Sequence, residues 1–104
     1  MGKIRWTEKA SDHLRSIFEY ISKDSKVYAA RFVKSLVEAA QRLEKTPGMG
    51  RIVPELEEYG FREVIYQNYR IVYRQLRDRS QVQILAVVHS ARDFKKVFLE
   101  DWEL

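Results

Sequence analysis

Residues 61–93, FREVIYQNYRIVYRQLRDRSQVQILAVVHSARD, decide the fold. The stretch contains three runs rich in β-branched and aromatic residues, at 61–66, 69–76 and 81–88, which is typical of strands. Two short polar segments, 67–68 and 77–80, separate the runs and are typical of turns. Strands joined by such short connections pair antiparallel. The stretch therefore predicts a three-stranded meander.

The length of the first turn decides which side chains share a face of this sheet. Asn68 tolerates left-handed backbone geometry, so Gln67 and Asn68 can form a two-residue hairpin turn that places Arg62 opposite Tyr73. Side chains alternate between faces along a strand, so Arg62 and Arg70 would then point to opposite faces. Only a longer turn or a bulge would bring them together. With a two-residue turn, Arg62 is expected to be structural and tied to glutamates of the preceding connector.

The first half of the chain predicts one strand and a pair of helices. Residues 3–6 alternate as in a short edge strand, and Thr7 is a suitable N-cap for the helix that follows. Apolar residues recur at helical spacing from Thr7 to about Asp24, which predicts a first helix. The same spacing predicts a second helix, which Asp24 or Ser25 caps and Pro47 ends. About one residue separates the helices, so they should form an antiparallel hairpin packed on the sheet.

A glycine- and glutamate-containing connector at 48–60 links the hairpin to the meander, and a short C-terminal helix is expected from about Arg92. The predicted order is β-α-α-β-β-β(-α), an α+β fold with an antiparallel sheet packed against an N-terminal helical hairpin. A chain of 104 residues fits one domain, taken as 1–104.

Composition excludes several functional classes. The chain has no cysteine, no glycine-rich phosphate loop and no nucleophile motif, and its two histidines, His13 and His89, lie far apart in sequence, so we expect no metal site and no cofactor. His13 is expected to be an inert surface residue. No apolar run is long enough for a membrane span and no export signal is evident, so a cytoplasmic location is expected. The net charge of +4 favours an anionic partner.

Basic residues of the predicted sheet are the main candidates for function. A solvated face, with arginines paired to nearby carboxylates, is the simpler interpretation. The sharper one is a surface that recognises an anion, because guanidinium groups bind phosphate or carboxylate in bidentate fashion. Arg70 in mid-sheet and Arg92 after the last strand are the leading positions. The candidate target- or anion-binding residues are Arg62, Arg70, Arg74, His89 and Arg92.

Several sequence pieces, in order, resemble the RelE/ParE toxin superfamily of bacterial type II toxin–antitoxin systems, over nearly the whole chain. They are Trp6-Thr7 at the end of the first strand, GRIVPEL at 50–56, FRE at 61–63, NYRIVY at 68–73 and VVHSARDF at 87–94. The resemblance implies a fold that agrees with the order of elements derived above. It also implies a cognate antitoxin as partner, within a toxin–antitoxin hetero-oligomer, and suggests Trp6, Phe18 and Tyr28 as antitoxin contacts.

Two activities are known in this superfamily, and this sequence resembles the members with one activity more than those with the other. RelE-like members are ribosome-dependent mRNA endonucleases, and that likeness would assign catalysis to Arg70, His89 and Arg92. The second predicted strand of the sheet carries Arg62-Glu63-Val64 where such members have paired lysines, however, and Phe98 stands about where they have a tyrosine.

ParE-like members inhibit DNA gyrase without catalytic residues of their own, and the motifs of this chain are closer to that branch. The resemblance therefore predicts the gyrase-inhibiting toxin of a plasmid-stabilisation type of system, neutralised by its antitoxin. The alternatives are an mRNA endonuclease acting on ribosomes and a degenerate member that only binds its partner.

Overall fold

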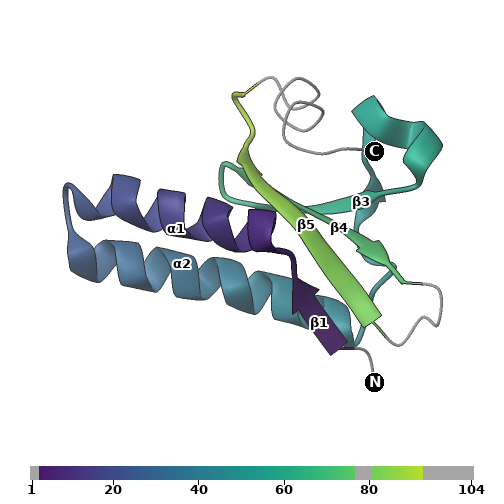
Figure 1. Ribbon diagram of the computed structural model, residues 1–104, viewed down its shortest axis with the longest axis horizontal. Coiled ribbons are helices and arrows are strands. Elements are labelled where there is room, and N and C mark those ends of the chain that lie inside the picture. The colour runs from purple at the N-terminus through teal and green to yellow at the C-terminus, as the bar shows by residue number, and fades with distance from the viewer. Residues whose placement is uncertain (1–2, 77–80, 93–104) are drawn as a thin grey trace.

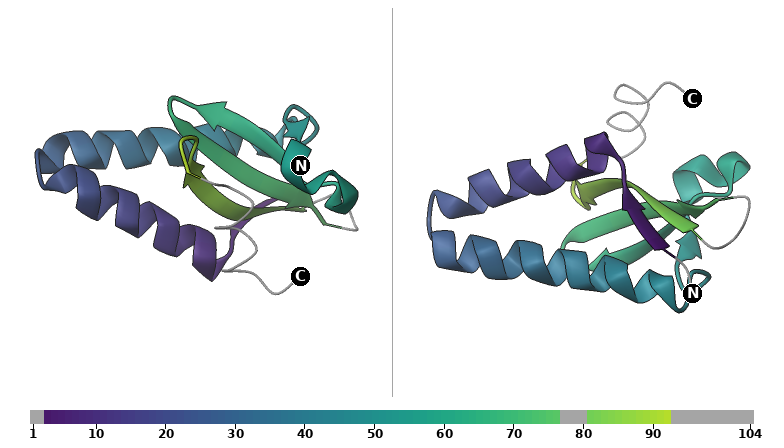
Figure 2. Two further views of the ribbon diagram at one scale, coloured as in Figure 1. Left: turned by 90° about the horizontal axis from the view of Figure 1, so that it is seen from above. Right: turned by 60° about the horizontal axis from the view of Figure 1, so that its bottom comes forward.

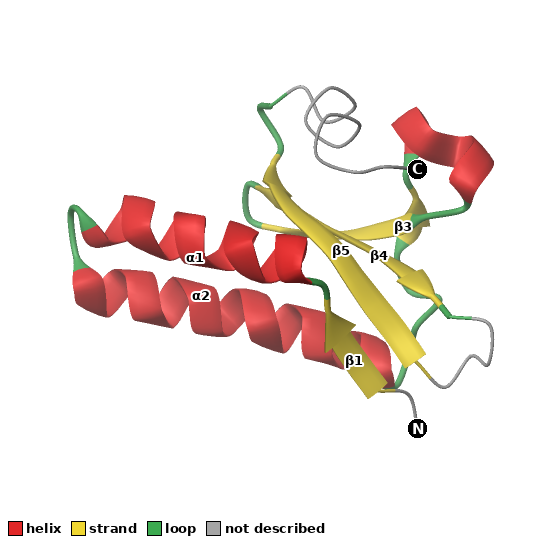
Figure 3. Cartoon of the chain, viewed as in Figure 1, coloured by secondary structure: helices red, strands yellow, loops and turns green. Residues whose placement is uncertain are grey.

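The computed structural model describes residues 3–76 and 81–92. Two antiparallel helices pack on one face of a twisted sheet, and the turn between the helices extends beyond the sheet (Figures 1 and 2). The helices are α1 (Glu8–Ser22) and α2 (Lys26–Gln41), with short 3₁₀ helices at Arg42–Glu44 and Pro54–Tyr59. The strands are β1 (Lys3–Trp6), β2 (Arg51–Ile52), β3 (Arg62–Tyr66), β4 (Tyr69–Gln75) and β5 (Gln81–His89). The predicted α+β class and helical hairpin are confirmed (Figure 3).

The sheet is mixed, which corrects the prediction of an antiparallel sheet. Its order is β1-β5-β4-β3-β2, with β1 parallel to β5 and the other pairs antiparallel. β1 lies at one edge, as its length suggested, but its direction is set by the pairing of residues 3–6 with residues 81–84, far away in the sequence. The two-residue strand β2, from the connector, forms the other edge and was not predicted.

The β3–β4 turn has the predicted two residues, because Tyr66 pairs with Tyr69 and Arg62 with Tyr73. The left-handed residue is Gln67, with φ 54°, rather than Asn68. A second irregularity lies between β4 and β5, where Val72 and Tyr73 pair with Ala86 and Ile84, so one residue of β5 is extra. This β-bulge re-aims the end of β5.

Side-chain caps fix both helix starts. The Thr7 hydroxyl accepts the Ala10 N–H at 3.1 Å and donates to the Ile84 carbonyl at 3.0 Å, which ties the start of α1 to β5. Ser25 caps α2 by accepting the Tyr28 N–H at 3.1 Å. α1 ends at Ser22, slightly before the predicted Asp24, and α2 gives way to a 3₁₀ turn before Pro47. The predicted C-terminal helix, expected from about Arg92, lies outside the described residues except for Arg92 itself.

Apolar side chains are buried on both faces of the sheet. The cluster beneath the helices includes Leu36, Leu43, Ile71, Tyr73 and Ile84. The cluster on the opposite face consists of Val53, Leu56, Phe61, Val72, Leu85, Ala86 and Val88, so the connector covers part of that face. Of the helices in the described ranges, none is long and apolar enough to cross a membrane.

Candidate functional site

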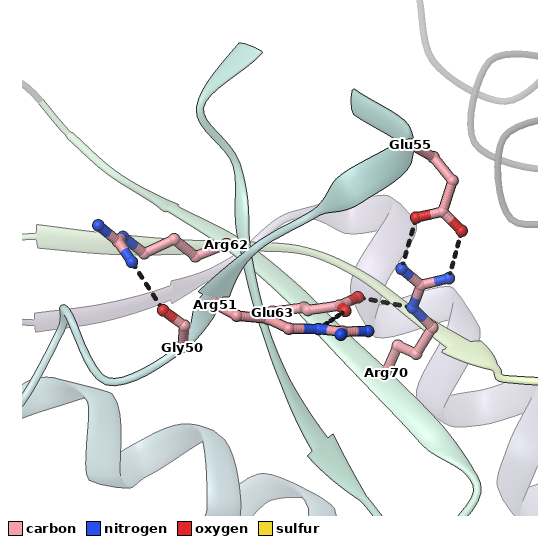
Figure 4. Close-up of polar contacts among 6 residues, drawn as sticks. All are labelled: Gly50, Arg51, Glu55, Arg62, Glu63 and Arg70. Atoms are coloured by element: carbon pink, nitrogen blue, oxygen red, sulfur yellow. Dashed lines mark hydrogen bonds and ion pairs between the residues drawn. The ribbon is translucent and has the colours of Figure 1, made fainter. Parts of the chain in front are cut away.

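Arg70, the leading candidate from sequence, is buried and held by two carboxylates. Its Nε donates to Glu63 Oε1 at 2.6 Å, and its two terminal nitrogens donate to the two oxygens of Glu55 at 2.8 Å each (Figure 4). The residue is only 8% exposed. The guanidinium of Arg70 is therefore paired inside the chain, because the connector folds over it and supplies a bidentate carboxylate, and its expected binding of an external anion stays a prediction.

The carboxylates of this network are strongly held. Glu63 is fully buried and also accepts a hydrogen bond from Arg51 Nε at 2.7 Å. The hydrogen bond from Arg70 lowers the pKa of Glu55 below its usual range, against the opposing effect of partial burial. In turn, the hydrogen bonds to Glu55 and Glu63 raise the pKa of Arg70. Arg70 and Glu55 therefore both stay ionised. We call Arg51, Glu55, Glu63 and Arg70 the connector clamp.

A second set of bonds fixes the start of the connector at Gly50. The Gly50 N–H donates to the Tyr73 hydroxyl at 2.9 Å, and that hydroxyl donates to the Pro47 carbonyl at 2.6 Å. Arg62 donates to the Gly50 carbonyl at 2.7 Å (Figure 4). Arg62 is therefore tied to the connector as expected, but through a backbone carbonyl instead of a glutamate. It lies on the helix-side face and Arg70 on the other, as the two-residue turn requires.

Arg74 presents its charge differently from Arg70. It is exposed on β4, and its Nε donates to the side-chain oxygen of Gln83 at 2.7 Å. A neutral amide orients the guanidinium without neutralising it. Arg74 therefore stays a candidate for binding an external anion.

His89 and Arg92 lie together at the end of β5, where a hollow of about 390 Å³ opens between α1 and the sheet. Each stays a candidate contact for a target. Arg92 is exposed, and no carboxylate within the described ranges forms an ion pair with it. The hollow is lined by His13, Ser16, Ile17, Tyr20, Tyr69, Val87, Val88, His89 and Arg92.

His13 is part of this hollow, which corrects its expected place as an inert surface residue. Its Nδ1 accepts the backbone N–H of Val87 at 3.1 Å. β1 pairs with β5 only as far as Trp6 and Ile84, so the rest of β5 lacks a strand on that side and α1 supplies the acceptor. A signal was present in the sequence, because His13 precedes the apolar Ile17 by four residues and shares its helix face.

His89 is oriented by the turn that follows it. Its Nδ1 accepts the Ala91 N–H at 3.0 Å, and its ring meets Tyr69 edge-on with centroids 5.1 Å apart. A neutral imidazole that accepts at Nδ1 carries its proton on Nε2. His89 in this arrangement is therefore a donor at Nε2 and cannot accept a proton there.

Aromatic side chains extend the site towards the helical turn. A second hollow of about 470 Å³ shares Tyr20, Tyr69, His89 and Arg92 with the first, and its other walls include Tyr28 and Phe32. Of the three suggested antitoxin contacts, Tyr28 is 56% exposed and lines this hollow. Trp6 and Phe18 are half-buried and do not line it. In residues 3–76 and 81–92, no three metal-ligating side chains come together.

Comparison with solved structures defines the class of protein. The chain matches one from the chromosomal ParDE toxin–antitoxin system of P. aeruginosa, with a TM-score of 0.70 and 25% identity, over 86% of this chain and 96% of that one. It also shares its fold with a chain of the RelBE2 toxin–antitoxin complex of Mycobacterium tuberculosis, with a TM-score of 0.65 and 24% identity, over 85% and 96% of the two chains. The fold is that of the RelE/ParE toxin superfamily.

Sequence comparison narrows this class to a family. Residues 4–94 match the family described as the ParE toxin of the type II toxin–antitoxin system parDE. The chain is also 36% identical, over 97 residues, to a protein of Sinorhizobium fredii named "Putative toxin Y4kP", covering 91% of this chain and 95% of that protein. The chain belongs to the ParE toxin family of type II toxin–antitoxin systems.

Proposed function

We propose that this chain is a toxin that inhibits DNA gyrase by binding it, without catalysing a reaction of its own. The match of residues 4–94 to the ParE toxin family carries this proposal, since the ParE-like branch is the one that the resemblance connects with gyrase. The RelE-type activity, cleavage of mRNA on the ribosome, is the alternative.

The state of Arg70 and His89 supports the gyrase proposal over the nuclease, whereas the exposed Arg92 is available under both. A nuclease site needs a cation that is free to stabilise the phosphorane and a base that can take a proton from the 2′-hydroxyl. Arg70 is already held by Glu55 and Glu63, so its charge is compensated internally. His89 accepts a backbone N–H at Nδ1, which leaves Nε2 protonated and unsuited to act as the base.

The same proposal includes an antitoxin that neutralises the chain in the cytoplasm, where gyrase acts. The structural relatives come from systems or complexes that pair a toxin with an antitoxin, which supports such a partner for this chain. Exposed aromatic surface at Tyr20 and Tyr28 on the helical hairpin offers an apolar contact area for it. Trp6 and Phe18 stay proposed contacts.

Of the candidate residues, Arg74 and Arg92 are exposed arginines that form no ion pair with a described carboxylate, and they are the proposed gyrase-facing cations. Arg74 is held by Gln83, and Arg92 lies beside the hollow at the end of β5. Charge of this kind speeds association with an acidic or nucleic-acid-bound target. Arg15 provides a matched control, because it is an exposed arginine on α1 that Asp12 already pairs at 3.0 Å.

A supercoiling assay with purified gyrase tests the proposal. The intact chain should inhibit supercoiling, the double variant Arg74→Ala/Arg92→Ala should inhibit about tenfold less, and Arg15→Ala should match the intact chain. Translating ribosomes programmed with a defined mRNA supply the second arm. Cleavage of that mRNA, with gyrase unaffected at molar excess, would establish the RelE-type alternative. Induction without growth arrest and without either activity would identify a member that only binds its partner.

A further inference from the structure

The two hollows at the end of β5 form one site with a polar part and an aromatic part. They share Tyr20, Tyr69, His89 and Arg92, and together they run from α1 past the end of β5 to the β3–β4 turn. In Figure 1 the helical hairpin extends beyond the start of β4 and the end of β5, where these hollows lie. The site is therefore built by three separate parts of the chain.

The polar part presents hydrogen-bond donors and positive charge. Arg92 contributes a guanidinium that cannot lose its proton. Ser16, Tyr20 and Tyr69 contribute hydroxyl groups, and no carboxylate is among the described residues of the lining. Lys23 adds a second cation close by, because its Nζ lies 5.9 Å from the Tyr20 ring centroid.

Backbone amides set the histidines of the site as donors as well. His89 accepts the Ala91 N–H at Nδ1, and His13 accepts the Val87 N–H at Nδ1. Each neutral ring then carries its proton on Nε2, the other nitrogen. The fold thus selects the tautomer that gives a hydrogen bond to an oxyanion, and opposes the one that would abstract a proton.

The aromatic part offers ring faces and edges next to these donors. Phe32 contacts Tyr28 with ring centroids 6.0 Å apart and Tyr69 at 5.6 Å. Tyr20 and Tyr28 are 70% and 56% exposed, so their rings are accessible to a ligand. Stacking on aromatic side chains is how proteins hold nucleobases without reading their sequence.

We propose that this site binds a nucleotide, with its phosphate at Arg92 and His89 and its base against Tyr28 and Phe32. The hydrogen-bond donors, with no carboxylate among the described residues of the lining, favour a ligand with an oxyanion. The adjoining aromatic side chains favour a ligand that also carries a planar ring. The combined space, about 390 Å³ and about 470 Å³ in its two overlapping parts, is of the size that small-ligand sites have. This inference is independent of gyrase inhibition and concerns the isolated chain.

Titration calorimetry of the full chain with adenosine monophosphate, uridine monophosphate and inorganic phosphate tests the proposal. Both nucleotides should bind saturably, and about tenfold more tightly than inorganic phosphate because of stacking. Arg92→Gln should weaken nucleotide binding about tenfold through the lost charge-assisted hydrogen bonds. Tyr28→Ala should weaken nucleotides while leaving inorganic phosphate unchanged, and Arg15→Gln should have no effect.

Two outcomes would overturn the assignment. Inorganic phosphate binding as tightly as the nucleotides would leave the aromatic walls without a part in recognition. Unchanged nucleotide affinity in Arg92→Gln, with that variant unfolding at the same denaturant concentration as the intact chain, would place any binding elsewhere on the surface. The result of the supercoiling assay does not affect either outcome, because no gyrase is present.

Discussion

Arg70 and Glu63 form an ion pair between adjacent strands in the interior of the protein. The Nε of Arg70 on β4 donates to Oε1 of Glu63 on β3 at 2.6 Å, and the two residues are 8% and 1% exposed. Arg51 and Glu55 complete the connector clamp on either side, so every charge in it has a partner. The sequence pieces that carry the family resemblance, at 50–56, 61–63 and 68–73, include all four of these residues. Much of the sequence that resembles the family therefore consists of residues that hold the connector on the sheet.

Removing Arg70 should destabilise the fold rather than only an activity. Arg70→Ala leaves Glu63 buried with a single remaining cation, and breaking a buried pair typically costs about 3–5 kcal/mol in the free energy of unfolding. Urea denaturation measures this loss. Arg74→Ala removes an exposed arginine from the same strand and should change stability by less than about 0.5 kcal/mol. Equal stability of the two variants would show that the clamp contributes nothing.

Gly50 should tolerate no side chain, in contrast to Gly48. A Cβ at Gly50 would lie 2.5 Å from the Glu63 carbonyl oxygen and 2.6 Å from the Tyr73 hydroxyl, whereas at Gly48 it would meet nothing within 4 Å. Overpacking of this kind costs about 1–3 kcal/mol, so Gly50→Ala should unfold at a clearly lower temperature. Gly48→Ala should be neutral or stabilising by less than about 1 kcal/mol. Thermal unfolding of both variants decides the point, and similar midpoints would contradict the packing described for Gly50.

Acid should weaken the connector clamp through Glu55. Arg70 lowers the pKa of Glu55 in the folded state, so this carboxylate contributes stability above its usual pKa of 4.5, and the contribution is lost as the pH falls through the lowered folded value. Glu55→Gln should remove this part of the acid dependence while lowering stability near neutral pH. Glu57→Gln, an exposed change in the same 3₁₀ segment, is the control. Denaturation at a series of pH values gives the slopes, and parallel curves for the intact chain and Glu55→Gln would refute the effect.

Local periodicity and turn chemistry were sufficient to predict the helices, four of the five strands in the described ranges and the β3–β4 register. The parallel pairing of β1 with β5 could not be predicted in this way, because it joins residues 3–6 to residues 81–84. β2 was missed for a different reason, since two residues carry no periodic signal and its pairing with β3 alone makes it a strand.

The site was harder to predict, because charge was taken as a sign of exposure. Arg70 does lie on the face opposite the helices, as alternation along β4 requires, but that face is not open there. Val53, Leu56 and Phe61 of the connector and its flank join a buried cluster on this face and bring Glu55 over Arg70. These apolar residues were visible in the sequence and are a signal, not used in the prediction, that the connector packs inward. Which carboxylate would meet which arginine depended on the irregular 3₁₀ path at 54–59.

His13 should be required for the order of the β5 end. Its Nδ1 is the acceptor for the Val87 N–H, and Val87 is 4% exposed. His13→Ala removes that acceptor, and an unsatisfied buried amide costs about 1–3 kcal/mol. Hydrogen exchange followed by NMR should show the Val87 amide exchanging faster in His13→Ala, and His13→Asn should restore part of its protection because the side-chain oxygen can accept in place of Nδ1. His89→Ala removes the acceptor of the Ala91 amide in an exposed turn and the ring contact with Tyr69, and it should leave Val87 protected. If the Val87 amide stayed as protected in His13→Ala as in the intact chain, the bond between α1 and β5 would have no part in holding the strand.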